Sequence, residues 1–372
     1  MTRLSLDRRH LLMGLGATSM AVPSVTVPAH RAAAAPSSEE FQRHLAEAEQ
    51  SGKVHDLHAL LVSQGGRLLF EHYGKGEDEG GDSQAGVVVT FGPEVLHDLR
   101  SVSKSVVGLA YGIALADGKV PPPEAKLYEH FPEYADLAKR PGRDRLTIGH
   151  VLSMTLGFEW DEFTIPYGTA GNSENAMEAA PDRFRFILDR PIVGEPGVKW
   201  TYCGGATAIL GRLIGKGTGE KLPAYARRVL FDPMGFGLST WRSGDDGEPR
   251  AASGCRLLPR DMLKVGQLAL AGGAWQGKQI VPADWVKQIT TPAVKIEGSL
   301  SYGYHWYIYD NMVDSHRQYW FGGIGWGGQR LYVFPLLDLV IAMNSGNYGK
   351  TLMEQNRVNL AVLNDVVFPS LA

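Results

Sequence analysis

Apolar residues recur at helical intervals in the stretch that follows Ser101. They are Val102, Val106, Leu109 and Ile113. Steps of four, three and four residues separate them, which is the spacing of one helix face. Gly118 comes after this stretch and is typical of a helix end. The pattern predicts an amphipathic helix of about four to five turns that begins at Ser101.

Strand patterns gather near both ends of the chain. Residues 57–62 and 67–71 are apolar runs on either side of Gln64-Gly65-Gly66, which predicts a β-hairpin. Residues 74–86, rich in glycine and acidic side chains, are expected to form a flexible loop. Further strands are expected over residues 87–90, 302–309, 318–321, 330–334 and 339–343.

Helical spacing predicts further helices over residues 37–53, 146–157, 206–214, 260–270 and 353–367. In the second of these, Thr147 is the expected N-cap and Gly157 the expected end. The chain is therefore strand-rich, then helical, then strand-rich. We expect an α+β fold in which helices flank an antiparallel sheet and an all-helical domain is inserted.

The expected sheet domain covers residues 36–117 and 261–372, and the mainly helical domain covers residues 118–260. The helix that begins at Ser101 would lie at their junction, which is a usual location for a cleft.

The N-terminus has the pattern of an export signal. Arg8-Arg9 precede a moderately apolar stretch over residues 11–22, and Ala32-Ala33-Ala34 offers a cleavage site. Residues 1–35 are predicted to be a signal peptide of the twin-arginine type, so an exported protein, periplasmic or secreted, is expected. Asp7 stands where such a signal usually has serine or threonine. A short basic tail is the alternative interpretation.

Composition and charge narrow the class further. Hydrophobic residues make up 44% of the 372 residues and charged residues 21%, as in ordinary globular proteins, and no apolar run reaches about 18 residues, so no membrane-spanning helix is predicted. The net charge is −3, and it is −6 without residues 1–35, which disfavours nucleic acid as a partner. Reduced, buried thiols are favoured for Cys203 and Cys255 over a disulfide, which export would permit.

Ser101 and Lys104 form an S-x-x-K motif at the start of the predicted helix. Residues three apart on a helix share a face, so the lysine can contact the serine and activate it as a nucleophile. The motif alone also fits an N-cap serine followed by a solvated lysine. The string G-x-G-x-x-G at residues 323–328 precedes a strand rather than a helix, which argues against a dinucleotide site.

Four stretches together carry a family resemblance. They are R-S-V-S-K-S at 100–105, L-T-I-G-H-V-L-S-M-T-L-G at 146–157, E-P-G-V-K-W-T-Y at 195–202 and G-W-G-G-Q at 325–329. In this order they resemble the serine β-lactamase and penicillin-binding protein superfamily. The resemblance is strongest to its class C-like branch of exported esterases, D-aminopeptidases and 6-aminohexanoate-dimer hydrolases. It covers nearly the whole chain after residue 35 and implies the β-lactamase/transpeptidase-like fold.

The resemblance also implies catalytic roles for three residues. Ser101 would be the acylated nucleophile, and Lys104 would hold or take its proton. Tyr202 would be the general base, its phenol acidified by nearby lysine. A core tyrosine is the alternative interpretation of Tyr202.

Other residues would bind the substrate. The backbone N–H groups of Ser101 and Trp326 would form the oxyanion hole, with Gly325 and Ile324 beside it. Tyr167 lies in a loop rich in glycine and asparagine and is a candidate to cover the site.

Two departures from the superfamily pattern bear on the substrate. The triplet 323–325 reads G-I-G where the superfamily has K-T-G or H-T-G, so the cation is missing. A charge-assisted contact of that kind contributes about 1.5–3 kcal/mol, and its loss argues against efficient turnover of β-lactams. Gly204 stands where the Y-x-N motif has asparagine, which removes an amide that would orient lysine and substrate.

The sequence thus predicts an exported serine hydrolase that cleaves an ester or amide bond of a small molecule through an acyl-enzyme on Ser101. This chemistry needs neither metal nor cofactor. A β-lactamase or D-alanyl peptidase is the first alternative, and a non-catalytic binding protein on the same fold is the second.

Overall fold

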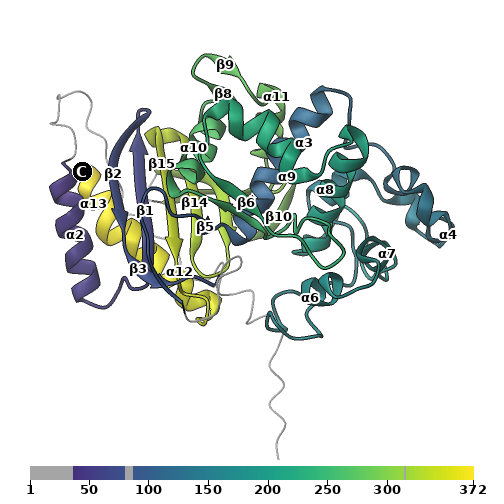
Figure 1. Cartoon of the computed structure of the whole chain (residues 1–372), viewed down its shortest axis with the longest axis horizontal. Coiled ribbons are helices and arrows are strands. Elements are labelled where there is room, and N and C mark those ends of the chain that lie inside the picture. Colours follow the sequence, from purple (N-terminus) through teal and green to yellow (C-terminus); the bar gives the residue numbers. More distant parts are fainter. Residues whose placement is uncertain (1–36, 80–86, 314–315) are drawn as a thin grey trace, which may run out of the picture.

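The computed structural model describes residues 37–79, 87–313 and 316–372 (Figure 1). The predicted signal peptide, residues 1–35, lies outside the described residues. Within the described part of the chain, no helix has both the length and the apolar composition needed to cross a membrane.

An eight-stranded antiparallel sheet forms the centre of the molecule. Its strands are ordered β10-β11-β12-β13-β14-β15-β1-β2, so the first hairpin of the chain pairs with the last strand. The strands are β1 (Leu57–Gln64), β2 (Arg67–Tyr73), β10 (Val294–Glu297), β11 (Leu300–Tyr302), β12 (Tyr307–Val313), β13 (His316–Gly325), β14 (Gln329–Phe334) and β15 (Leu339–Ser345). Their apolar side chains are buried because helices cover both faces, and the α+β class is confirmed.

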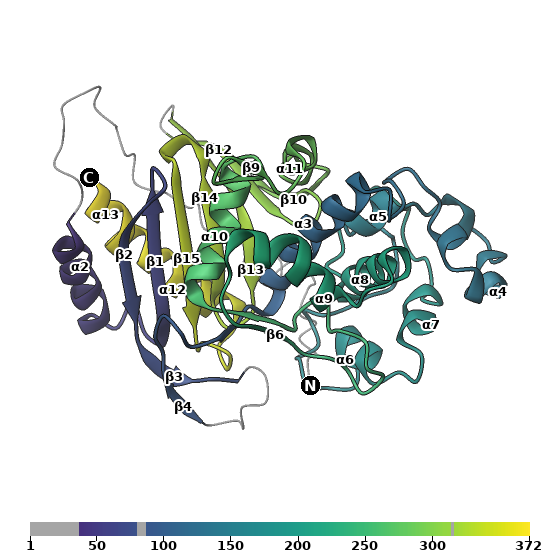
Figure 2. The same cartoon turned by 45° about the horizontal axis from the view of Figure 1, so that its top comes forward.

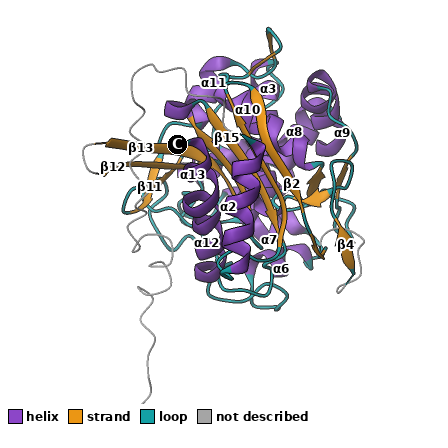
Figure 3. Cartoon of the chain, turned by 90° about the vertical axis from the view of Figure 1, so that its left-hand side faces the viewer, coloured by secondary structure: helices purple, strands orange, loops and turns teal. Residues whose placement is uncertain are grey.

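One face of the sheet is covered by the first described helix and by the C-terminal helices. The elements there are α2 (Ser38–Gln50), α12 (Leu352–Ala361), the π-helix η8 (Val362–Val367) and α13 (Phe368–Leu371). Figure 3 shows this layer in front of the strands. The opposite face carries α10 (Pro259–Leu270) together with α3 (Ser103–Ala116) and α11 (Ala283–Ile289). A Cβ at Gly266 of α10 would lie only 2.5 Å from Cγ1 of Val340, so this helix packs directly on the sheet.

A group of helices extends beyond α3, away from the sheet (Figure 2). It contains α4 (Ala135–Ala138), α5 (Ile148–Leu152), α6 (Ser173–Glu178), α7 (Arg183–Leu188), α8 (Gly204–Thr218) and α9 (Leu222–Ala226). The central helix is α8, which packs against α3, α5, α7 and α9. The predicted domain boundaries stay a prediction.

Short elements connect these parts. The helical turns are η1 (Arg100–Val102), η2 (Leu127–His130), η3 (Pro132–Tyr134), η4 (Arg143–Arg145), η5 (Arg227–Phe231), η6 (Asp232–Met234) and η7 (Pro335–Leu337). The short strands are β3 (Lys75–Glu77), β4 (Val88–Thr90), β5 (His97–Asp98), β6 (Ser239–Trp241), β7 (Cys255–Leu257), β8 (Ala274–Trp275) and β9 (Lys278–Gln279). Three of them form the small sheet β5-β7-β6.

Several secondary-structure elements predicted from the sequence are present in the structure, and others differ from it. The hairpin at 57–71 and the Thr147 cap are confirmed, the latter by its acceptance of the His150 N–H. A single strand over 302–309 is wrong, because the chain leaves the sheet through His305, whose φ is +65°, between β11 and β12. The expected loop at 74–86 begins with β3, which pairs with β4, and residues 80–86 lie outside the described residues.

The helix expected from Ser101 has a different first turn. Residues 100–102 form the 3-10 turn η1, and the α-helix α3 starts at Ser103. The strand expected over 318–321 extends further, because residues 322–325 are the last part of β13. The helix expected over 146–157 ends at Leu152.

Candidate active site

The backbone just before Ser101 is strained and held by one buried carboxylate. Arg100 has a φ of +46°, an unfavourable conformation for a residue with a side chain. Its N–H donates to Oδ1 of Asp98 over 2.7 Å, and its Nε lies 3.1 Å from Oδ2 of the same carboxylate. Asp98 therefore fixes the turn that presents Ser101.

Lys104 contacts Ser101 as the S-x-x-K spacing predicts. Its Nζ lies 3.0 Å from Oγ of Ser101 and also donates to the carbonyl oxygen of Ala252 over 3.0 Å. The side chain is 1% exposed, so the alternative of a solvated lysine is wrong. Because Ala252 comes from the segment before β7, the lysine is held from two separate parts of the chain.

Tyr202 lies against the same lysine. Nζ of Lys104 is 4.7 Å from the centroid of the Tyr202 ring, and the ring of Phe163 stacks on the tyrosine at 4.8 Å. The expectation that lysine acidifies the phenol is wrong. Burial, reinforced by the carboxyl of Glu162, raises the pKa of Tyr202 well above its ordinary value, and the interaction with Ser101 lowers it only in part.

Ser101 and Tyr202 open into one cavity, which we call the nucleophile cavity. It measures about 390 Å³, part of it open to solvent. Its lining residues are Ser101, Phe163, Tyr167, Tyr202, Tyr307, Ile324, Gly325, Trp326 and Leu352. The structure thus brings together all the predicted site residues. Lys104 is not among the lining residues of the cavity, but its Nζ contacts Oγ of Ser101. The ring centroids of Tyr167 and Trp326 lie 5.8 Å apart, and none of the nine lining residues has a charged side chain.

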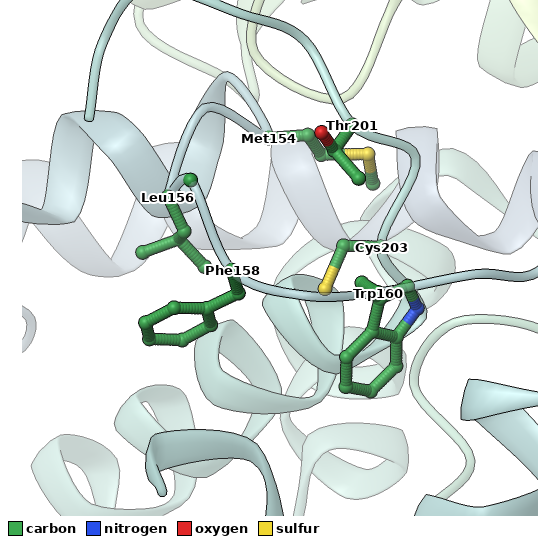
Figure 4. Close-up of a pocket in the computed structure, with 7 residues that line it drawn as sticks. Met154, Leu156, Phe158, Trp160, Thr201 and Cys203 are labelled. Atoms are coloured by element: carbon green, nitrogen blue, oxygen red, sulfur yellow. The ribbon is translucent and has the colours of Figure 1, made fainter. Parts of the chain in front are cut away.

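A second, smaller cavity of about 190 Å³ lies next to the segment that carries Tyr202 (Figure 4). Its wall includes Thr201 and Cys203, and the thiol of Cys203 points toward Phe158 and Trp160. Cys203 and Cys255 are both free and buried, as favoured from the sequence. Burial raises the pKa of both thiols, which keeps them protonated and unreactive.

The end of β13 approaches the nucleophile turn closely because Gly323 and Gly325 have no side chains. A Cβ at Gly325 would lie 2.7 Å from the carbonyl oxygen of Leu99. A Cβ at Gly323 would lie 2.9 Å from Cγ1 of Val102 and 3.1 Å from Oγ of Ser105. These glycines let the end of β13, and Trp326 directly after it, lie beside Ser101.

Comparison with known proteins identifies the family. The beta-lactamase family model matches residues 41–363. The chain belongs to the beta-lactamase family. It is 25% identical over 314 residues to the 6-aminohexanoate-dimer hydrolase of Paenarthrobacter ureafaciens, and the match covers 76% of this chain and 71% of that protein. The family and this relative make the chain a serine hydrolase of the esterase or amidase kind.

Solved structures share the fold. A Bacillus anthracis protein provisionally assigned as a 6-aminohexanoate-dimer hydrolase superposes with a TM-score of 0.67 at 20% identity, covering 86% of this chain and 81% of that one. EstCE1, a hydrolase with promiscuous acyltransferase activity, gives a TM-score of 0.64 at 14% identity, with coverages of 86% and 98%. The fold of this beta-lactamase-family protein is therefore that of its structural relatives.

The site contains two buried carboxyl groups that the sequence analysis missed. Glu162 and Glu174 are 3% and 8% exposed, and both lie close to Gly204. Neither belongs to a recognised motif or a periodic stretch. The one available signal was Gly204 itself, because a glycine in place of a side chain beside Tyr202 leaves space that another residue must fill.

Proposed function

We propose that this beta-lactamase-family hydrolase cleaves an ester or amide bond of a neutral small molecule through an acyl-enzyme on Ser101. The observation that carries the proposal is the 3.0 Å contact between Nζ of Lys104 and Oγ of Ser101 in a buried site. A serine becomes a strong nucleophile when a neighbouring base takes its proton.

The steps follow from the positions of these groups. Oγ of Ser101 attacks the carbonyl carbon, and its proton passes to the pair formed by Lys104 and Tyr202. That pair returns a proton to the leaving alcohol or amine. A water molecule then attacks the acyl-enzyme and releases the acid. Backbone N–H groups of Ser101 and Trp326 are proposed to bind the oxyanion.

The nucleophile cavity favours an uncharged, apolar acyl group. Its aromatic and aliphatic lining, as far as the described residues form it, offers no cation for a substrate carboxylate. Position 323, where the superfamily has a cation, has no room for a side chain beside Val102. Both features support neutral esters or linear amides over β-lactams and D-alanyl peptides.

Intact-mass analysis after exposure to a fluorophosphonate probe tests the nucleophile. A single adduct is expected on the wild type and none on Ser101→Ala. Hydrolysis of p-nitrophenyl esters, 6-aminohexanoate dimer and a chromogenic cephalosporin then ranks the substrates, with the neutral ester expected ahead of the dimer, whose two ends are charged, and of the cephalosporin. Absence of an adduct on the wild type would refute the proposal, and faster cephalosporin turnover would assign a β-lactamase.

We further propose that the chain is exported by the twin-arginine route. Support comes from Arg8-Arg9 ahead of the apolar stretch at residues 11–22. Replacing both arginines by lysine should leave the precursor inside the cell, whereas Arg3→Lys should be processed normally. Equal processing of all three proteins would refute the proposal.

A further inference from the structure

The carboxyl group of Glu162 links two walls of the active site. Its Oε1 accepts hydrogen bonds from the backbone N–H of Gly204 and from Nε1 of Trp160, the latter over 2.5 Å. Its Oε2 accepts one from the hydroxyl of Tyr167 over 3.1 Å. One buried side chain therefore joins the aromatic wall of the nucleophile cavity to the start of α8, two residues after Tyr202.

Gly204 provides the space that this carboxyl group occupies. A Cβ at position 204 would lie 3.0 Å from Oε1 of Glu162, 3.3 Å from Cδ of Glu174 and 3.5 Å from Cβ of Ala252. The carbonyl of Ala252 is the second acceptor of Lys104. Because residue 204 has no side chain, the carboxyl groups of Glu162 and Glu174 both approach its backbone, next to Ala252.

The charge of Glu162 acts on the groups that transfer the proton. Burial, with a smaller effect of Glu174, raises the pKa of Glu162 to about 8, and Lys104 opposes the rise. Ionised Glu162 in turn raises the pKa of the phenol of Tyr202. The titratable groups that face it are Lys104 on α3, Glu174 on α6, Tyr167, Tyr202 and Cys203 from the segments between α5 and α8, and Tyr302 and Tyr307 on β11 and β12.

We infer that Glu162 is a positioning residue for the hydrolysis at Ser101. Its hydrogen bonds hold the segment that carries Tyr202 and the ring of Tyr167 against the nucleophile cavity. Its protonation state changes the electrostatic field at Lys104, and thereby the ease with which Ser101 loses its proton. This inference rests on the proposed function, and it adds a residue outside the recognised motifs to the machinery.

The test is the rate of phosphonylation of Ser101 by the fluorophosphonate probe between about pH 6 and pH 10 in wild type and Glu162→Gln. Glutamine keeps the shape and the acceptor for Gly204 but carries no charge. At about pH 6 the two rates should agree within about threefold, because Glu162 is then protonated. The wild type should show an inflection near pH 8 that the variant lacks.

Above that inflection the variant should react about three to ten times faster than the wild type. The reason is that ionised Glu162, which raises the pKa of Tyr202, is present in the wild type only. Glu159→Gln is the matched control, because Glu159 is an exposed partner of Arg190 at 2.7 Å and should leave the profile unchanged.

A second variant tests the same inference with Glu162 in place. Glu174 raises the pKa of Glu162, so Glu174→Gln should move the inflection to lower pH. The inference is overturned if profiles of wild type and Glu162→Gln coincide or differ by one constant factor at every pH, or if the inflection stays in place in Glu174→Gln. A wild type that gains no adduct at any pH would instead refute the proposed function.

Discussion

Nζ of Lys104 lies 3.0 Å from Oγ of Ser101 and equally far from the carbonyl oxygen of Ala252. The lysine is thus fixed by an acceptor far away in the sequence, and it has no freedom to turn toward water. The i, i+3 spacing on a helix brings Lys104 to Ser101. The carbonyl oxygen of Ala252, in the segment before β7, then holds the ammonium group of Lys104 in place. The contact between Ser101 and Lys104 is therefore fixed by the fold and not only by the helix that carries both residues.

Lys104→Met is expected to lower the turnover number on a preferred ester by about 10²–10⁴-fold, because it removes the group that takes the proton of Ser101 while keeping an apolar stem of similar length. Steady-state kinetics with the ester found by substrate profiling measures this. Lys264→Met is the control. It removes a lysine that lies outside the active site, where its Nζ is 2.8 Å from Oδ1 of Asp261. A Lys104→Met enzyme with near-normal turnover would contradict the assigned role.

Tyr202→Phe is expected to lower the turnover number by about 10²–10⁴-fold without a comparable loss of thermal stability. The variant keeps the stacking with Phe163 and loses only the hydroxyl. Tyr309 stacks on Trp320 of β13, and the control variant Tyr309→Phe should retain full activity. Equal activities of the two variants would mean that Tyr202 is a core residue.

Leu352→Ala is expected to shift the preference of the enzyme toward longer acyl chains. Leu352 lines the nucleophile cavity at the start of α12, and its truncation lengthens the apolar space. The ratio of kcat/KM for octanoate over butyrate p-nitrophenyl esters should rise about tenfold. The neighbouring Met353 is 52% exposed, so Met353→Ala should leave the ratio unchanged. An unchanged ratio in Leu352→Ala would place the acyl group elsewhere.

Much of the fold could be predicted because hydrophobic spacing decides it locally. The first hairpin and helices such as α10 follow directly from apolar periodicity. The strand expected over 302–309 failed because the conformation of His305, at a φ of +65°, is set by tertiary contacts. Its ring is held between the carbonyl of Leu152 and the hydroxyl of Thr207, both distant in sequence.

Only those residues of the active site that lie in a sequence motif could be predicted. Ser101, Lys104 and Tyr202 stand in recognisable strings, and the structure brings them together. Glu162 has no such string, since its importance comes from a space left by Gly204, which is visible only in three dimensions. The raised pKa of Tyr202 was missed for a similar reason, because the burial of the phenol and the nearby carboxyl of Glu162 are set by the tertiary structure.

Acid should destabilise the protein through a buried histidine pair. Nδ1 of His58 lies 2.9 Å from Nε2 of His97, and burial lowers the pKa of His58 to about 4 and that of His97 to about 3. Between pH 6.5 and about 4 the unfolded chain binds protons that the folded chain excludes. The free energy of unfolding should therefore fall as the pH falls through this range.

Urea unfolding at several pH values between about 4 and 7 measures this dependence. His97→Gln should give a shallower fall than the wild type, because one proton-excluding group is gone. The partly exposed His55 serves as control, and His55→Gln should keep the wild-type slope. A slope unaffected by His97→Gln would assign the acid sensitivity to other groups.

The missing cation at position 323 should not be restorable by a single substitution. Even a methyl group there would lie 2.9 Å from Cγ1 of Val102 and 3.1 Å from Oγ of Ser105, both beside the nucleophile turn. Gly323→Ala should therefore lower the free energy of unfolding by about 1–3 kcal/mol and slow the labelling of Ser101, because η1 must move. Gly349→Ala is the control, since a Cβ at that position meets no atom within 4 Å.

Gly323→Lys extends the same argument to the substrate. The lysine brings the charge that binds a carboxylate, but its stem needs space that β13 and η1 do not leave. We expect this variant to lose esterase activity without gaining hydrolysis of a chromogenic cephalosporin. A stable Gly323→Lys protein with new cephalosporinase activity would show that charge alone separates this enzyme from β-lactam turnover, and that the close packing at position 323 does not.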